Sequence, residues 1–431
     1  MVQRALDPLF RPKAVAVIGA TKTPNKMGHD ILKNLISYGF RGPIYPINPK
    51  YDEIYDIKCY PTVLDVVDRI DLAVVTVPIE NSIKLMSELA AKGVKAVVVT
   101  SRVESGKEEL VDYLHDAAER NGIKMLGPET FGIIYTHARL NATYMNDPQV
   151  RAGHVAVMSF STHVTTAIAG MANYQSVGLS AVVQLGERPT VSEAEILEWL
   201  KDDRRTRVIV VVLSEMTDDL QKELERVNEK KPVITVSHSI FFSEKGLLEA
   251  SSVREALNWS LTFASKKKYR GSRTLIVTND DKATEALKVM ARDTQLDLID
   301  VPEEIIKEIN MSTPEEVRLE NPLGVPVQLP SYVFTGVLEK ASFSHEVDNV
   351  VIVYFETPLS NPDNVVEAVL GIWDRTEKMI VVAMMGGKKT AEGVMRLREN
   401  GVPAYFMPED SLKSLDAFIK WHSVRSHERR T

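Results

Sequence analysis

The chain has 431 residues, of which 44% are hydrophobic and 26% charged, as in an ordinary globular protein of about three domains. Its formal net charge of −7 gives no reason to expect nucleic acid as a partner, and no apolar run approaches the roughly 20 residues of a membrane span. The single cysteine, Cys59, excludes an internal disulfide and a cysteine-rich metal site. With no signal-peptide pattern at the N-terminus, we expect a cytoplasmic protein that binds neither a membrane nor a metal of its own.

The first predicted unit opens with a strand, a glycine-containing loop and a helix. The apolar run 14–18 is typical of a buried parallel strand, and Gly19 follows it at once. An amphipathic helix through Ile31 and Leu35 comes next. Such a geometry places unpaired backbone N–H groups and the positive end of the helix dipole where a phosphate can bind.

The second predicted strand, 44–47, ends in Asn48-Pro49-Lys50. A dinucleotide-binding unit usually carries an acidic residue there, which binds the ribose 2′-OH. Here the sequence has an amide and a cation instead. This change favours a ligand with an extra phosphate on the ribose, and coenzyme A is such a ligand.

Strands and helices continue to alternate, with strands at 71–78 and 96–100 and helices at 82–91 and 107–121. Two further units start with strands at 154–158 and 274–279, and the last helix is expected near 411–421. We therefore predict an α/β protein of three doubly wound domains, 1–145, 146–268 and 269–431. The strand ends of the first domain should bring its loops to one ligand.

A series of short motifs runs through roughly 400 residues of the chain: Val17-Ile18-Gly19-Ala20-Thr21, Tyr45-Pro46-Ile47-Asn48-Pro49-Lys50, Val77-Pro78, Leu126-Gly127-Pro128, Asn141-Ala142-Thr143, Lys231-Pro232-Val233, Asn321-Pro322, Met385-Gly386-Gly387 and Gly401-Val402-Pro403. Their order and spacing resemble the α-type subunit of ADP-forming acyl-CoA synthetases, which are relatives of succinyl-CoA synthetase. The resemblance implies a Rossmann-like CoA-binding domain at 1–145, followed by two flavodoxin-like domains.

The resemblance also implies a site and a mechanism. Coenzyme A would be held by Gly19, Ala20, Thr21 and Lys26 at its phosphates, by Asn48, Pro49 and Lys50 at its nucleotide end, and by Val77 and Pro78 beside the adenine. A histidine on a mobile loop carries phosphate in this family, and a glutamate orients it. ATP and ADP would act only through a separate ATP-grasp subunit, so an oligomer is expected.

Several functional loops depart from the family pattern. A Ser-Gln-Ser-Gly type loop reads Ser159-Phe160-Ser161-Thr162 here, so that a β-branched residue replaces the glycine. A Gly-Pro-Asn stretch reads Gly127-Pro128-Glu129. Asn279 to Ala283 replaces a glycine-rich loop, and the Ala-Ser-His-Thr-Gly-Ser loop expected after Val236 is not found.

Three residues are candidates for the missing catalytic groups. Glu193 matches the orienting glutamate, His163 lies in the first turn of the helix after the altered loop, and His238 ends a strand. Each also has a plain structural explanation, as a helix-start or strand-end residue.

Two hypotheses of different class stay open, and with them the question of whether the chain is an enzyme. The first is a CoA- or acyl-CoA-binding homologue that is non-catalytic or repurposed, a pseudoenzyme. The second is an active ADP-forming acyl-CoA (acetate–CoA) ligase α subunit that works with an ATP-grasp β subunit. A third reading is an interaction scaffold whose ligand loops are relics.

Overall fold

The computed structural model describes residues 2–146, 149–213, 216–237, 246–312 and 317–428. The chain divides into two compact units, Met1–Phe242 and Ser243–Thr431, and each is considered by itself below. None of the described helices combines the length and apolar character that crossing a membrane requires.

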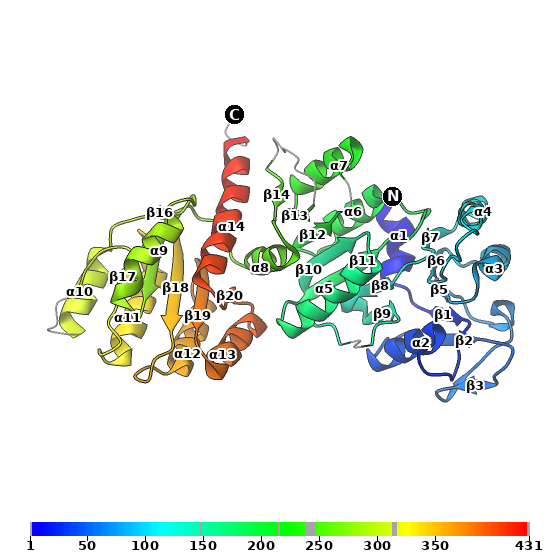
Figure 1. Cartoon of the computed structure of the whole chain (residues 1–431), viewed down its shortest axis with the longest axis horizontal. Helices are drawn as coiled ribbons and strands as arrows, with labels where there is room; N and C mark the ends of the chain where they lie inside the picture. Colours follow the sequence, from blue (N-terminus) through cyan, green and yellow to red (C-terminus); the bar gives the residue numbers. More distant parts are fainter. Residues whose placement is uncertain (1, 147–148, 214–215, 238–245, 313–316, 429–431) are drawn as a thin grey trace. The chain divides into compact units, whose positions relative to one another are not determined.

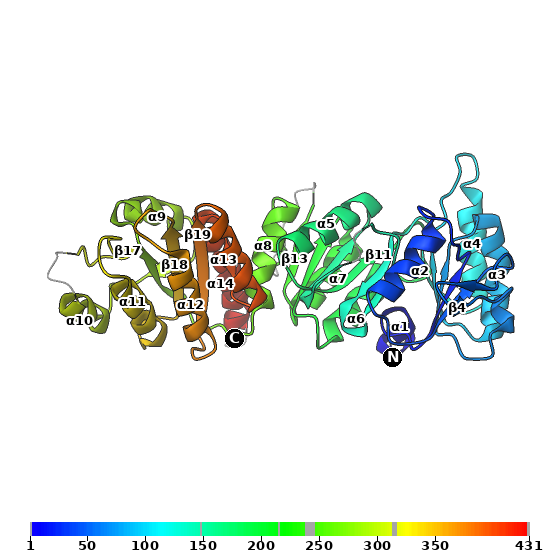
Figure 2. The same cartoon turned by 90° about the horizontal axis from the view of Figure 1, so that it is seen from below.

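A five-stranded parallel sheet forms the first part of unit 1, in the order β2-β1-β5-β6-β7. Its three inner strands, β1, β5 and β6, are short apolar runs rich in valine and buried along their whole length, as expected for a sheet covered by helices on both faces. Helices α3 and α4 lie on one face and α1 and α2 on the other (Figure 2). The elements are α1 (Val2–Phe10), β1 (Val15–Ile18), α2 (Met27–Ser37), β2 (Ile44–Ile47), β3 (Glu53–Ile54), β4 (Ile57–Lys58), the 3₁₀ turn η1 (Val63–Asp65), β5 (Leu72–Val75), α3 (Ile79–Lys92), β6 (Ala96–Val99), α4 (Glu109–Arg120) and β7 (Lys124–Leu126).

The second sheet of unit 1 has the order β13-β12-β10-β11-β8-β9. Helix α5 lies on one face of it, and α6 and α7 lie on the other (Figure 1). The elements are β8 (Gly132–Tyr135), the 3₁₀ turn η2 (Thr136–Ala138), β9 (Leu140–Thr143), β10 (Ala152–Ser159), α5 (Thr162–Tyr174), β11 (Leu179–Gln184), α6 (Glu193–Asp202), β12 (Val208–Val212), α7 (Asp218–Asn228) and β13 (Val233–Val236).

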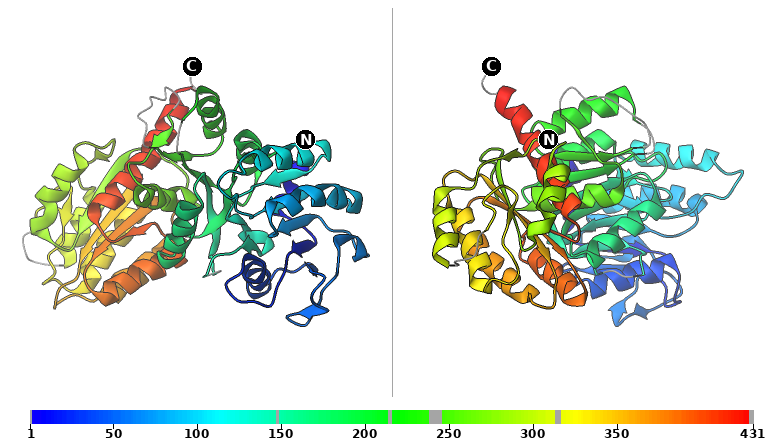
Figure 3. Two further views of the ribbon diagram at one scale, coloured as in Figure 1. Left: turned by 45° about the vertical axis from the view of Figure 1, so that its right-hand side comes forward. Right: turned by 60° about the vertical axis from the view of Figure 1, so that its left-hand side comes forward.

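Unit 2 contains a parallel sheet in the order β16-β15-β18-β19-β20, with β17 beside β15. Helices α10 to α13 cover one face, and α14 lies on the other (Figure 3). The elements are β14 (Leu248–Glu249), α8 (Val253–Ala264), β15 (Arg273–Thr278), the 3₁₀ turn η3 (Asp281–Ala283), α9 (Thr284–Ala291), β16 (Asp297–Leu298), α10 (Glu303–Ser312), β17 (Leu323–Gly324), α11 (Ser331–Phe343), β18 (Asn349–Phe355), α12 (Pro362–Trp373), β19 (Met379–Met385), α13 (Lys388–Glu399), β20 (Ala404–Tyr405) and α14 (Pro408–Glu428).

The predicted doubly wound α/β fold is confirmed. In the first sheet β1 lies between β2 and β5, in the second sheet β10 lies between β11 and β12, and in unit 2 β15 lies between β16 and β18. At each of these positions the strand order reverses, which creates a switch point at the carboxyl ends of the strands. One feature differs from expectation, because the second sheet is mixed rather than parallel. The hairpin β8–β9 joins it antiparallel to β11, although its residues precede the predicted boundary at 145. The boundaries at 145 and 268 stay predictions.

Candidate functional site: a phosphate loop and a pocket at the first switch point

Gly19 begins the loop after β1 and has a backbone that favours glycine. Its φ is +86°, and a Cβ atom there would lie 2.6 Å from Thr76 Oγ1 and 3.0 Å from a methyl carbon of Val77. Gly28, the second residue of α2, comes equally close, since its Cβ would lie 2.2 Å from the Gly19 carbonyl oxygen. The two glycines therefore let the loop, the helix start and the end of β5 pack together.

The N-terminus of α2 has no side chain that caps it. Lys26 is the N-cap residue, its side chain accepts no bond from the helix, and it is exposed. The first-turn N–H groups of a helix that lacks such a cap can bind a phosphate oxygen. Phosphate binding at this end of α2 stays a prediction.

Asn48 holds the two ligand loops together. Its Nδ2 donates to the Ala20 carbonyl (2.8 Å), and its Oδ1 accepts from the Lys50 N–H (3.0 Å). Thr21 shares a hydrogen bond with the Tyr51 hydroxyl (3.0 Å), and this bond lowers the pKa of Tyr51. These side chains fix the shape of the loops through bonds within the protein.

A pocket of about 590 Å³ opens where β1, β2 and β5 end. The residues on which its chemistry depends are Gly19, Asn48, Lys50, Val77, Asn81 and Lys84. The side chains of Lys50 and Lys84 are exposed cations, and Glu88 is the one carboxylate among the lining residues. A pocket of this volume with two cations suits a phosphorylated ligand.

The predicted binding residues fall into two groups. Gly19, Asn48, Pro49, Lys50 and Val77 line the pocket together. The remaining four are not among its lining residues, and they are Ala20, which is buried, Thr21, Lys26 and Pro78, which is the N-cap of α3.

Sequence reasoning missed the contribution of helix α3. Asn81, Lys84, Leu85 and Glu88 all line the pocket, and their spacing of three and four residues places them on one face of the helix. That spacing is visible in the sequence and could have identified the face.

A second group of loops meets at Glu129, between the carboxyl ends of the first and second sheets. The Glu129 N–H donates to the Ser101 carbonyl (3.1 Å), and the Thr162 hydroxyl donates to the Glu129 carbonyl (3.1 Å). Thr162 also bonds Gln184 Oε1 (3.2 Å). The loops that the resemblance assigns to phosphate and acyl chemistry are thus brought to one place.

The Glu129 carboxylate already has a partner there. Glu129 has a φ of +57°, and its Oε1 accepts from the Val103 N–H (2.8 Å). Burial raises the pKa of nearby Tyr144, while the charges of Arg102 and Glu129 act on it in opposite directions. Arg102, from the loop after β6, and Glu129, from the loop after β7, are therefore both close enough to Tyr144 to act on its hydroxyl.

The altered loop after β10 uses its hydroxyl groups internally. Ser161 caps α5 by accepting from the Val164 N–H, and the buried Ser159 hydroxyl accepts from the Ser161 N–H (3.3 Å). His163, in the first turn of α5 as predicted, is exposed. Glu193 is the first residue of α6, and among the described residues no hydrogen bond or ion pair joins it to His163. His238, the third candidate, lies outside the described residues.

Comparison with known proteins identifies the family. A model described as a CoA binding domain matches residues 13–136, and one described as a succinyl-CoA ligase like flavodoxin domain matches residues 152–262. The α subunit of acetate–CoA ligase (ADP-forming) I from Pyrococcus furiosus is 32% identical over 453 aligned positions, which cover 97% of this chain and 98% of that subunit. That alignment is longer than this chain, so the relative has residues without a counterpart here.

Two further relatives agree with this assignment. The acetate–CoA ligase (ADP-forming) of Methanocaldococcus jannaschii is 30% identical over 97% of this chain, which spans 63% of that longer protein. A solved structure of Ca. Korarchaeum cryptofilum dinucleotide forming acetyl-coenzyme A synthetase 1, in complex with phosphate and ADP, superposes with a TM-score of 0.89 at 30% identity, covering 99% of this chain and 98% of that one. The chain belongs to the family of α-type subunits of ADP-forming acyl-CoA ligases.

Proposed function

We propose that this chain binds coenzyme A in the pocket of the first sheet and serves as the α subunit of an ADP-forming acyl-CoA ligase. The observation that carries the proposal is Gly19, which follows β1 directly, has no side chain and lines the pocket together with Lys50 and Lys84. A Cβ atom at this position would lie in the space between the loop and the side chains of Thr76 and Val77. The two cations suit the ribose phosphate that distinguishes coenzyme A from a free diol.

The reaction would require a second subunit that binds ATP. The partner proposed is an ATP-grasp subunit, by analogy with the Pyrococcus furiosus relative, whose name marks it as one subunit of a ligase that forms ADP. The loops that meet at Glu129 would then hold the acyl and phosphoryl groups. His163, His238 and Glu193 are the proposed positions for the carrier and its orienting group.

The test has two parts, and they separate binding from chemistry. Isothermal titration should show one CoA bound per chain, and a flat trace would reject the whole proposal. Incubation with an ATP-grasp subunit of the family and γ-labelled ATP should then place an acid-labile label on this chain. The variants His163→Gln and His238→Gln locate the label, because only the variant that removes the carrier abolishes it.

A second candidate function is CoA or acyl-CoA binding without phosphoryl transfer. The observation that favours it is the loop after β10, where Thr162 replaces glycine and the hydroxyls of Ser159 and Ser161 serve the loop itself. CoA binding together with a complete absence of label, in the presence of an active ATP-grasp subunit, would select this function over the first.

A further inference from the structure

We propose that a cationic cavity at the amino ends of the strands of the second sheet binds a phosphorylated anion with at least two negative charges. The cavity measures about 660 Å³. Its walls come from the end of α1, from the turn after β8 and from the turn between α6 and β12. The CoA pocket and the Glu129 loops lie at the carboxyl ends of strands instead, and neither shares a residue with this cavity, so the site is separate from both.

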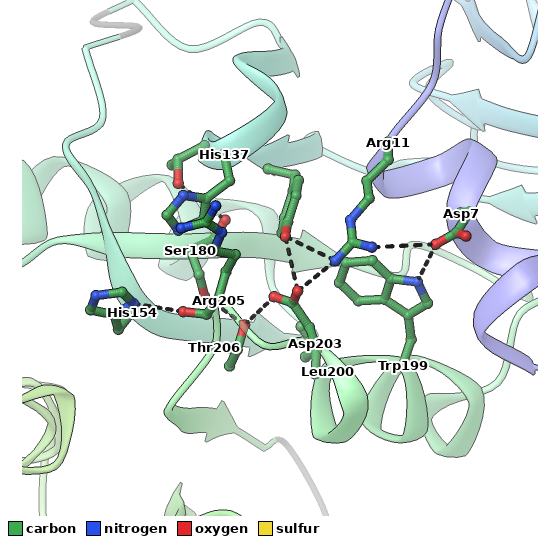
Figure 4. A network of polar contacts seen from close by, with 12 residues as sticks. Asp7, Arg11, His137, His154, Ser180, Trp199, Leu200, Asp203, Arg205 and Thr206 are labelled. Carbon is green, nitrogen blue, oxygen red and sulfur yellow. Dashed lines mark hydrogen bonds and ion pairs between the residues drawn. The ribbon is translucent and has the colours of Figure 1, made fainter. Parts of the chain in front are cut away.

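The acidic residues of the cavity are neutralised within the protein. Asp203 is fully buried and accepts hydrogen bonds from Arg11 Nη2 (2.6 Å), the Tyr135 hydroxyl (3.0 Å) and the Thr206 hydroxyl (2.9 Å) (Figure 4). Asp202 forms an ion pair with Lys230 (2.7 Å). Neither carboxylate is left to repel an incoming anion.

Two guanidinium groups of the cavity form no side-chain hydrogen bond or ion pair within the described residues. Arg204 and Arg205 are consecutive, exposed and part of the cavity wall. In the part of the chain that the structure describes, no ion pair or side-chain hydrogen bond engages either group, and only the Arg205 carbonyl is used, as an acceptor for His154 Nδ1 (2.7 Å). The cavity therefore presents two positive charges to solvent.

The rest of the wall is rigid. The Arg11 guanidinium lies over the rings of Trp199 (4.9 Å) and Tyr135 (5.4 Å) and is bonded to buried Asp203, so its remaining N–H groups point in fixed directions. His137 is held by a bond from Nε2 to the Gly153 carbonyl (2.8 Å), which places its proton on Nε2.

The ligand class follows from this chemistry. Guanidinium groups bind phosphate oxygens in pairs, and two of them match the charge of a diphosphate better than that of a single carboxylate. The cavity is of ordinary small-molecule size. The net charge of −7 opposes a nucleic acid polymer, so we infer a small phosphorylated ligand, either a free polyphosphate or the phosphate chain of a nucleotide.

Isothermal titration of the full-length protein with pyrophosphate, ATP and inorganic phosphate tests the proposal. Pyrophosphate and ATP should bind at one site per chain and more tightly than phosphate. The double variant R204A/R205A should weaken both by about tenfold or more, as expected for the loss of two charged hydrogen-bonding groups. Tighter binding of ATP than of pyrophosphate would identify the nucleotide as the source of the phosphates.

The matched control is K33A/K95A, which removes two exposed cations of unit 1 that line neither cavity. It should leave pyrophosphate affinity unchanged, and R204A/R205A should leave CoA affinity unchanged. Binding that saturating CoA abolishes, binding that the double variant does not weaken, or no binding of any of the three ligands would each overturn the proposal. The outcome is independent of whether the chain binds CoA.

Discussion

The first sheet of unit 1 and the sheet of unit 2 have the same strand order, and each has a pocket at its switch point, yet the two pockets differ in chemistry. In the first sheet, Gly19 follows the first strand directly and leaves the crevice open. In unit 2, Asn279 follows β15 directly, and its amide bonds both the N–H and the carbonyl of Phe355 at 2.8 Å, which ties the end of β15 to β18. The strand order determines where a pocket forms. The residue after the first strand, Gly19 or Asn279, determines whether a side chain bridges the ends of that strand and its neighbour.

The charges of the two pockets differ as well. The pocket of the first sheet contains Lys50, Lys84 and Glu88, whereas the pocket of unit 2, about 500 Å³ in volume, is lined by proline, aliphatic, aromatic and neutral polar residues. A phosphate group that enters the pocket of unit 2 would lose its hydration without gaining a cation. We therefore expect coenzyme A to distinguish the two pockets.

The largest effect is expected at Gly19. Gly19→Ala places a Cβ atom against Thr76 and Val77 in a left-handed backbone conformation, and it should weaken CoA binding about a hundredfold or more. The control is Gly93→Ala, where φ is +88° but no heavy atom lies within 4 Å. Gly93→Ala should lower the free energy of unfolding by about 1 kcal/mol and leave CoA affinity unchanged. If titration calorimetry shows the same change in CoA affinity for both variants, the loop at Gly19 does not have the proposed role in binding.

A smaller effect is expected from the cations of the first pocket. Lys50→Ala and Lys84→Ala should each weaken CoA binding by about tenfold, as for the loss of one charged hydrogen bond. The affinity for 3′-dephospho-CoA should change little in the variant whose lysine contacts the ribose phosphate. Lys33→Ala, an exposed cation on α2, serves as the control. If both ligands lose affinity equally in both variants, the lysines do not read the ribose phosphate.

In unit 2, Asn279 should matter for stability alone. Asn279→Leu removes both bonds to Phe355 and should lower the free energy of unfolding of this unit by about 1–3 kcal/mol, because a backbone donor and acceptor lose their partner. Asn400→Leu removes one exposed bond to the Arg396 carbonyl and should cost less than about 0.5 kcal/mol. Denaturant unfolding measures both, and a drop in CoA affinity for Asn279→Leu would contradict the division of roles.

The smallest effect is expected at the rim of the uncharged pocket. Leu359 lines it and is 71% exposed, so Leu359→Lys should leave folding nearly unchanged while it adds a cation there. CoA should still bind at one site per chain by titration calorimetry, because the β15 crevice stays closed by Asn279. A second CoA site in the wild type or in this variant would show that the strand order alone is enough for CoA to bind at a switch point.

The sequence predicted the features that depend on local patterns. The apolar runs of β1 and β10, the turn at Gly19 and the position of His163 at a helix start all follow from short-range signals. The family resemblance supplied the order of the domains. These features could be found because each depends on residues close to one another in the chain.

The features that the sequence did not predict depend on partners far away in the chain. The antiparallel hairpin β8–β9 joins β11 some 40 residues later, and the bond from Asn48 to Ala20 joins two loops. The cavity with Arg204 and Arg205 is another example, because the neighbouring carboxylates of Asp202 and Asp203 pair with Lys230 and Arg11 from elsewhere in the chain. Neither pairing has a signature within a short window of sequence.

The docking of helix α1 has a consequence for how unit 1 folds. Phe10 stacks on Trp199 at 3.7 Å, and the Trp199 indole N–H donates to Asp7 (3.1 Å), so residues that precede the first sheet are buried against α6 of the second. The hairpin β8–β9 likewise joins the second sheet from within the first stretch of the chain. The two sheets therefore share one cooperative unit. A fragment that stops near residue 145 would leave Phe10 without its stacking partner and the hairpin β8–β9 without β11.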